Sequence, residues 1–124
     1  MEIKDNLKYT KDHEWVMLDG KIATVGITDF AQSELGDIVY IEVDTVDEEL
    51  NKDEVFGTVE AVKTVSELFL PMSVKIIEFN ESLNDNPEKV NDSPYDEGWI
   101  IKVEITNPAE LDELLDSKTY SEIT

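Results

Sequence analysis

The chain has 124 residues, 40% of them hydrophobic, and it contains no cysteine and no arginine. Thirty acidic residues and ten lysines give a formal net charge of −20. This size and apolar content suit a single domain over residues 1–124, without metal or disulfide staples. The composition excludes disulfides, thiolate metal sites and a cysteine nucleophile, and it disfavours nucleic acids and anionic membranes as partners.

The ends and the charge of the chain indicate a soluble protein. No apolar region of a signal peptide follows residues 1–5, and no segment approaches the roughly 20 apolar residues of a membrane span. We therefore expect a monomer in a bacterial-type cytoplasm. The negative surface would steer it toward basic patches on partners, or it serves solubility alone.

Residues 1–14 carry no clear period, and the next two strands are joined by Asp19-Gly20, a hairpin signal. A short helix should then begin at Thr28, whose hydroxyl can cap it, and end at Gly36. Residues 44–52 read as an acidic loop. Strands are expected at residues 15–18, 21–27, 37–43, 54–61, 65–70, 74–79 and 99–105.

The C-terminal part is expected to be helical over residues 107–123. Asn107 would cap this segment, Pro108 suits the first helical position, and Glu110 would complete a capping box. Ser117 is expected to cap a final turn from which Tyr120 and Ile123 pack back. One or two helical turns are expected near residues 87–90. The fold class is therefore mainly β with short helices, as a small barrel or sandwich.

The stretch from Gly57 to Leu70 is too long for one strand and should form a hairpin over residues 55–70. If the chain reverses at Lys63, this lysine lies at the tip, with Glu60 opposite Ser66. A bare lysine amine, with a pKa of about 10.4, is a solvated cation and does no chemistry at neutral pH. Most exposed lysines have no role beyond that.

The surroundings of Lys63 give it a more specific meaning. Several segments, in this order, resemble the glycine cleavage system H protein family, and the resemblance runs from Leu7 to Tyr120. The segments are Tyr9–Trp15, Ala23–Asp29, Leu35–Val39, Glu60–Lys63, Val65–Leu68, Asp85–Glu88, Ser93–Tyr95 and Gly98–Lys102. The resemblance implies a lipoyl-domain-like barrel-sandwich hybrid with flanking and C-terminal helices.

The resemblance also implies a covalent cofactor, lipoate, attached to Lys63 as a swinging arm. Glu60 would be recognised by the lipoylating enzyme, and Glu67 would lie near the loaded arm. Glu14, with Asp12 where serine is common, would hold the aminomethylated arm in a surface cleft. Pairing of these acids with a protonated amine is the physical reason.

The implied function is that of a carrier rather than an enzyme. Its partners would be a pyridoxal phosphate-dependent glycine decarboxylase, a tetrahydrofolate-dependent aminomethyltransferase and dihydrolipoyl dehydrogenase. A lipoyl or octanoyl transferase, or a lipoate ligase, would load it. The alternatives are a lipoate relay to other lipoyl domains and an unmodified acidic interaction module. A biotin carrier fits less well, because Val62 and Thr64 stand where that family has methionines.

Two positions depart from the family pattern, since Val74 and Lys52 replace usual glycines. Either the turn near Val74 has been rebuilt or valine strains it, and Val74→Gly is expected to raise the melting temperature. His13, the only histidine, lacks the neighbouring ligands of a metal site. A surface or capping role is expected for it.

Overall fold

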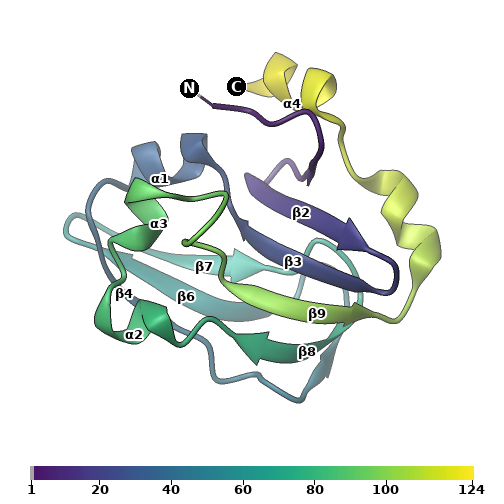
Figure 1. The fold of residues 1–124 in the computed structure, drawn as a ribbon, viewed down its shortest axis with the longest axis horizontal. Helices are drawn as coiled ribbons and strands as arrows, with labels where there is room; N and C mark the ends of the chain where they lie inside the picture. The colour runs from purple at the N-terminus through teal and green to yellow at the C-terminus, as the bar shows by residue number, and fades with distance from the viewer. Residues whose placement is uncertain (1) are drawn as a thin grey trace.

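The computed structural model describes residues 2–124, which form two β-sheets and several short helices (Figure 1). The strands are β1 (Lys8–Tyr9), β2 (Glu14–Asp19), β3 (Ile22–Ile27), β4 (Ile38–Glu42), β5 (Glu49–Leu50), β6 (Val55–Ala61), β7 (Val65–Phe69), β8 (Val74–Phe79) and β9 (Ile101–Ile105). The helices are α1 (Asp29–Leu35), α2 (Ser82–Asp85), α3 (Lys89–Asp92) and α4 (Ser117–Ile123), with a 3₁₀ helix over Pro108–Glu113. The expected class, mainly β with short helices, is confirmed.

The larger sheet has the strand order β1-β2-β3-β9-β8-β5, and the smaller one has the order β4-β6-β7. Every strand pairs with its neighbours in the antiparallel direction. Buried side chains from both sheets, among them Val25, Ile76 and Val103 from one and Ile41 and Val59 from the other, form one apolar cluster. The two sheets thus share a core, and the short helices lie around its margin.

The first hairpin differs by one residue from its prediction. Asp19 pairs with Ile22, so Gly20 and Lys21 are the two turn residues rather than Asp19 and Gly20. Gly20 has φ +64, a conformation that glycine adopts without the steric cost of a side chain. The helix that follows agrees with its prediction. The Thr28 hydroxyl accepts a hydrogen bond from the Ala31 N–H (3.2 Å), and Gly36 ends α1 with φ +80.

The C-terminal segment does not use the predicted capping box. Asn107 makes no capping hydrogen bond, and Glu110 instead accepts from the Ser73 N–H (2.8 Å), so a single 3₁₀ helix forms where an α-helix was expected. The cap of α4 is Asp116, which accepts from the Thr119 N–H (2.8 Å), and not Ser117. The predicted caps thus fail for two reasons: a distant backbone N–H binds Glu110, and Asp116, one residue before Ser117, caps α4.

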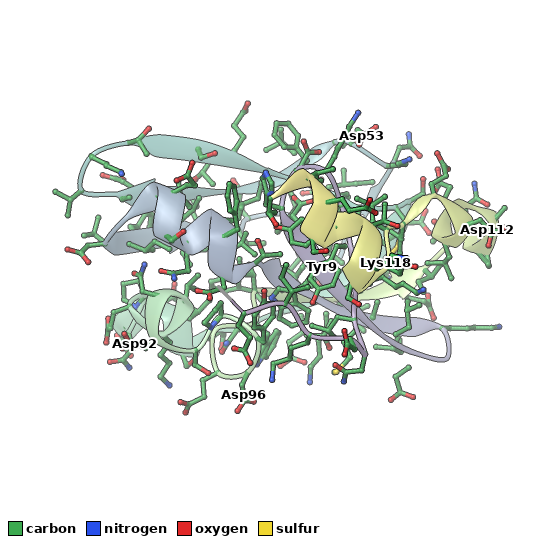
Figure 2. All side chains as sticks on the ribbon, turned by 90° about the horizontal axis from the view of Figure 1, so that it is seen from above. Tyr9, Asp53, Asp92, Asp96, Asp112 and Lys118 are labelled. Atoms are coloured by element: carbon green, nitrogen blue, oxygen red, sulfur yellow. The ribbon has the colours of Figure 1, made fainter. Side chains whose placement is uncertain are left out.

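A second apolar cluster holds α4 against the N-terminal strands. The rings of Tyr9 and Tyr120 stack with centroids 4.6 Å apart, and Figure 2 looks down on α4 with Tyr9 beneath it. Tyr120 is fully buried, as expected, whereas Ile123 is 49% exposed and does not pack back. The segment that follows Glu2 and the helix α4 therefore lie on the same side of the molecule (Figure 1).

His13 belongs to this cluster rather than to the surface or to a helix cap. Its Nδ1 lies 2.8 Å from the Tyr120 hydroxyl, which is also 2.7 Å from the Thr28 hydroxyl. Its ring packs against Phe30, with centroids 4.5 Å apart. Burial lowers the pKa of His13, which favours the neutral ring. The residue links α4 to the start of α1.

Val74 is not in a strained backbone conformation, which favours a rebuilt turn over a strained valine. Its side chain is fully buried, and it pairs with Ile105 and Leu50 at the start of β8. The non-glycine residues with positive φ in the described chain are His13, Asp47 and Asp53, and Val74 is not among them. The chain has rebuilt this turn around valine. Lys52, at the other position where the family usually has glycine, forms an ion pair with Glu113 (2.7 Å).

Candidate functional site

The predicted hairpin is formed by β6 and β7, with its reversal at residues 61–64, which we call the lysine turn. Glu60 pairs with Val65, and the Ala61 N–H donates to the Thr64 carbonyl (2.7 Å). Val62 and Lys63 are therefore the two central residues, and the turn is not centred on Lys63. The predicted opposition of Glu60 and Ser66 is wrong by one residue, because Ser66 pairs with Val59.

Lys63 is exposed at the tip, and its side chain runs along the end of α1. A Cβ atom built on Gly36 would lie 3.4 Å from the Lys63 Cε, so the absent side chain of Gly36 leaves room for the lysine stem. No ion pair of Lys63 occurs among residues 2–124. The amine is thus accessible to an enzyme that would acylate it, and the turn fits the attachment of lipoate.

The hairpin presents a mixed apolar and acidic outer face beside this lysine. Glu60 lies between Tyr40 on β4 and Val65 on β7. The exposed fractions of Val62 and Val65 are 75% and 65%, and Tyr40 is 46% exposed. Large apolar side chains this exposed, close to one lysine, offer contact area to a protein that must grip the tip.

Glu14 is buried between the two sheets and is not a surface carboxylate. Only 3% of it is exposed, and its Oε2 accepts a hydrogen bond from the Phe69 N–H of β7 (2.9 Å). The Thr10 hydroxyl lies 3.2 Å from Oε1. Burial raises the pKa of Glu14 to about 8, against the opposing effect of the hydrogen bonds from Phe69 and Thr10. The neutral acid is therefore the main form at neutral pH.

Asp12 and Glu14 border a cavity of about 200 Å³ near the base of the hairpin, which we call the acidic cavity. Asp53 and Glu113 add two further carboxylates to its lining, which also contains Lys11 and Lys52. Because Glu113 pairs with Lys52, the other three carboxylates of the lining are the ones that suit an organic cation, provided that its charge draws the Glu14 proton off.

The candidate residues are gathered in two places rather than one. Lys63 and Glu60 belong to the tip, whereas Asp12 and Glu14 lie at the acidic cavity. Glu67 is exposed between them on β7, opposite Thr58. Four residues of extended strand span about 13 Å, so Glu67 is within reach of a long arm on Lys63. Among residues 2–124, no group of three or more histidine or acidic side chains could hold a metal ion.

Sequence reasoning missed the residues that support the lysine turn from outside the hairpin. The Val62 N–H donates to the carbonyl of Asp37 (3.0 Å), and Asn91 on α3 bonds to both neighbours of Asp37. Gly36 was identified only as a helix end, and Asn91 lay in an expected loop. These contacts join segments about 25 to 55 residues apart, and no local pattern announces them.

An exposed lysine at the tip of a rigid hairpin, on two small sheets with a shared core, defines a carrier domain of the lipoyl type. Comparison with known proteins gives the family. Residues 7–124 match the family model described as glycine cleavage H-protein. Two proteins named glycine cleavage system H protein, from two strains of Staphylococcus epidermidis, are 53% and 52% identical over 123 residues, covering 99% of this chain and 98% of each relative.

A solved structure agrees with these sequence matches. The crystal structure of a glycine cleavage system H protein from Mycobacterium marinum superposes with a TM-score of 0.87 at 35% identity, covering 97% of both chains. The chain belongs to the glycine cleavage system H protein family, and its fold is the lipoyl-domain-like barrel-sandwich that the resemblance implied.

Proposed function

We propose that this chain is the lipoylated shuttle of a glycine cleavage system, with lipoate joined by an amide bond to the Lys63 Nζ. The observation that carries this proposal is the position of Lys63, exposed at the tip of an anchored two-residue turn in a member of this family. The bound group supplies a dithiolane that accepts an aminomethyl group and is later reoxidised, chemistry that this cysteine-free chain lacks.

The residues of the chain would present and protect the arm. The lysine turn holds the attachment point away from the sheets, and Glu60, between Tyr40 and Val65, would be read by the lipoylating enzyme. Asp12, Glu14 and Glu67 would receive the protonated amine of the loaded arm. Because Glu14 is buried and mainly neutral, the arriving cation would have to stabilise its carboxylate, so docking should release a proton.

The proposed partners follow from that role. A pyridoxal phosphate-dependent glycine decarboxylase would load the arm, a tetrahydrofolate-dependent aminomethyltransferase would unload it, and dihydrolipoyl dehydrogenase would reoxidise it. A lipoyl or octanoyl transferase, or a lipoate ligase, would modify Lys63. We place this work in the cytoplasm of a bacterial cell and assign no catalytic residue to the chain. In the described residues 2–124, no helix is long and apolar enough to cross a bilayer.

Peptide mass spectrometry of the protein from lipoate-replete cells tests the attachment. We expect a lipoyl or octanoyl mass increment on the peptide that contains Lys63 and none after Lys63→Arg. Lys21→Arg is a matched control, because Lys21 is also the second central residue of a two-residue hairpin turn. It should leave the increment unchanged. Unmodified Lys63 in such cells would overturn the proposal in favour of an inert acidic module.

A second experiment separates the shuttle from a lipoate relay. Purified protein, mixed with the glycine decarboxylase, should support glycine-dependent exchange of carbon dioxide, and Lys63→Arg should abolish that exchange. Full lipoylation of Lys63 without any exchange would contradict the shuttle and favour the relay.

A further inference from the structure

Asn91 uses its whole side-chain amide to hold the segment that follows α1. Its Nδ2 donates to the Gln32 Oε1 and to the Gly36 carbonyl, both at 2.9 Å. Its Oδ1 accepts from the Ile38 N–H, also at 2.9 Å. An exchange of Oδ1 and Nδ2 would set donor against donor and acceptor against acceptor, so one orientation of the amide satisfies all three partners.

Asp37 lies between Gly36 and Ile38, the two backbone partners of Asn91, and supports the lysine turn. The Asp37 carbonyl accepts the N–H of Val62, which directly precedes Lys63 (3.0 Å). In the described chain, this is the backbone hydrogen bond that ties residues 62–63 to a segment outside the hairpin. Beyond the ladder pair of Ile38 and Ala61, the orientation of the tip therefore depends on where the Asp37 carbonyl points.

Helix α3, which carries Asn91, is packed firmly against the rest of the protein. Its neighbour Val90 is fully buried in the main core, and α3 packs beside α1 (Figure 1). Gly98 passes so close to α3 that a Cβ on it would lie 2.7 Å from the Lys89 carbonyl oxygen and 2.8 Å from the Val90 Cα. Asn91 thus connects the packed core to Gly36 and Ile38, the two residues that flank Asp37.

We propose that Asn91 is the positioning residue of the lysine turn, which sets the direction in which Lys63 offers its amine for acylation. The inference deepens the proposed function and rests on it. Amide formation requires the amine to be held about 3–3.5 Å from the activated acyl carbon. If the turn became ordered only in the enzyme complex, the entropy cost of ordering it would weaken the binding of the enzyme. Asn91 removes this loss by ordering the turn beforehand.

The test compares Asn91→Ala with Asn80→Ala. Asn80 is a matched control, because its amide, like that of Asn91, donates two hydrogen bonds and accepts one; it donates to the backbone carbonyls of Glu97 (3.0 Å) and Trp99 (2.8 Å). Asn80 has no contact with the lysine turn. Amide hydrogen exchange at Val62 reports the order of the turn. Steady-state kinetics with a purified lipoate ligase, on the unmodified full-length proteins, report how efficiently Lys63 is acylated.

We expect Asn91→Ala to speed exchange at Val62 and to lower kcat/KM for acylation of Lys63, each by about five- to tenfold, the effect of one or two lost hydrogen bonds. Asn80→Ala should also lose one or two hydrogen bonds and so lower the overall stability of the protein. The rate of exchange at Val62 and kcat/KM for acylation should nevertheless stay within about twofold of wild type. Should either alanine variant fail to fold, Asn91→Asp and Asn80→Asp provide the same comparison, since an aspartate in place of Asn91 would keep the acceptor for Ile38 but lose both donors.

The outcomes distinguish this inference from the proposed function. Wild-type exchange at Val62 and wild-type kcat/KM in Asn91→Ala would overturn the positioning role while leaving Lys63 as the modified residue. Equal losses in the Asn91 and Asn80 variants would also overturn it, because they would report general destabilisation. A wild-type protein that the ligase never acylates would overturn the proposed function, and exchange at Val62 would still decide whether Asn91 orders the turn.

Discussion

Glu14 shows how a single buried residue can connect both sheets. It begins β2 in the larger sheet, and its carboxyl group receives the Phe69 N–H of β7 in the smaller one. A protonated carboxyl group can satisfy both Phe69 and Thr10 without the desolvation cost of a buried charge. The same proton has to leave if the residue is to pair with a docked amine.

The raised pKa of Glu14 predicts a stability that falls with pH. The pKa is about 8 in the folded protein, against an ordinary value of 4.5. The neutral form is therefore favoured by folding, and its stabilisation is complete below about pH 4.5 and is lost as the pH rises through about 8. The difference corresponds to at most about 5 kcal/mol. Glu14→Gln keeps an acceptor for Phe69 and does not titrate.

Urea unfolding at pH 5, 7 and 9 measures this effect. The free energy of unfolding should fall between pH 5 and 9 more steeply in wild type than in Glu14→Gln, so that the glutamine variant is the more stable protein at pH 9. Glu48→Gln, which changes an exposed acid, should keep the wild-type slope. Parallel curves for wild type and Glu14→Gln would show that Glu14 does not titrate in this range.

At the scale of elements, the strands were predictable and their exact pairing was not. Every strand of five or more residues overlaps a predicted one, because β-branched and alternating residues mark such strands wherever the partner lies. The two-residue strands β1 and β5 are too short to show a period. Both hairpin turns were displaced by one residue, since turn hydrogen bonds rather than composition fix the register.

The candidate site was predictable only where a local motif marks it. Lys63 stands in a local motif, so its exposed position at a hairpin tip could be read from the chain. The burial of Glu14 could not, because it depends on Phe69, 55 residues away. The support of the turn by Asn91 could not be predicted from the sequence either. The same holds for the link from His13 to Tyr120, which are 107 residues apart. Such contacts are created by the packing of elements and leave no periodic signal.

The strand β8 gives a prediction opposite to the one drawn from the family pattern. Val74→Gly removes a fully buried side chain from this strand and adds backbone freedom to the unfolded chain. Together these effects should cost about 3 kcal/mol and lower the Tm by roughly 10 °C. Thermal unfolding followed by circular dichroism measures the change. Val39→Gly, at a strand residue that is 48% exposed, should cost clearly less. A higher Tm for Val74→Gly would show that valine does strain the turn.

Ion pairs compensate little of the negative charge of the whole molecule. Asp53, Asp92, Asp96 and Asp112 are all exposed and lie at separate places in the view of Figure 2. Three ion pairs occur among the described residues; both partners are exposed in two of them, and Lys52 is half-buried in its pair with Glu113. Such pairs contribute at most about 1 kcal/mol each. With a net charge of −20, repulsion within the folded protein should exceed their contribution.

This imbalance predicts that salt stabilises the fold. Raising NaCl from 0.01 M to 1 M shortens the Debye length from about 30 Å to about 3 Å, which screens the repulsion between distant carboxylates more than any short ion pair. The Tm should therefore rise by roughly 5 °C or more over this range. A variant with four exposed acids neutralised should have a higher Tm at 0.01 M salt and a smaller rise, since it has less repulsion to screen. The four changes are Glu48→Gln, Glu81→Gln, Asp112→Asn and Glu122→Gln. A Tm that is constant or falls with salt would mean that attractive pairs, and not the excess of carboxylates, dominate the electrostatic free energy of this protein.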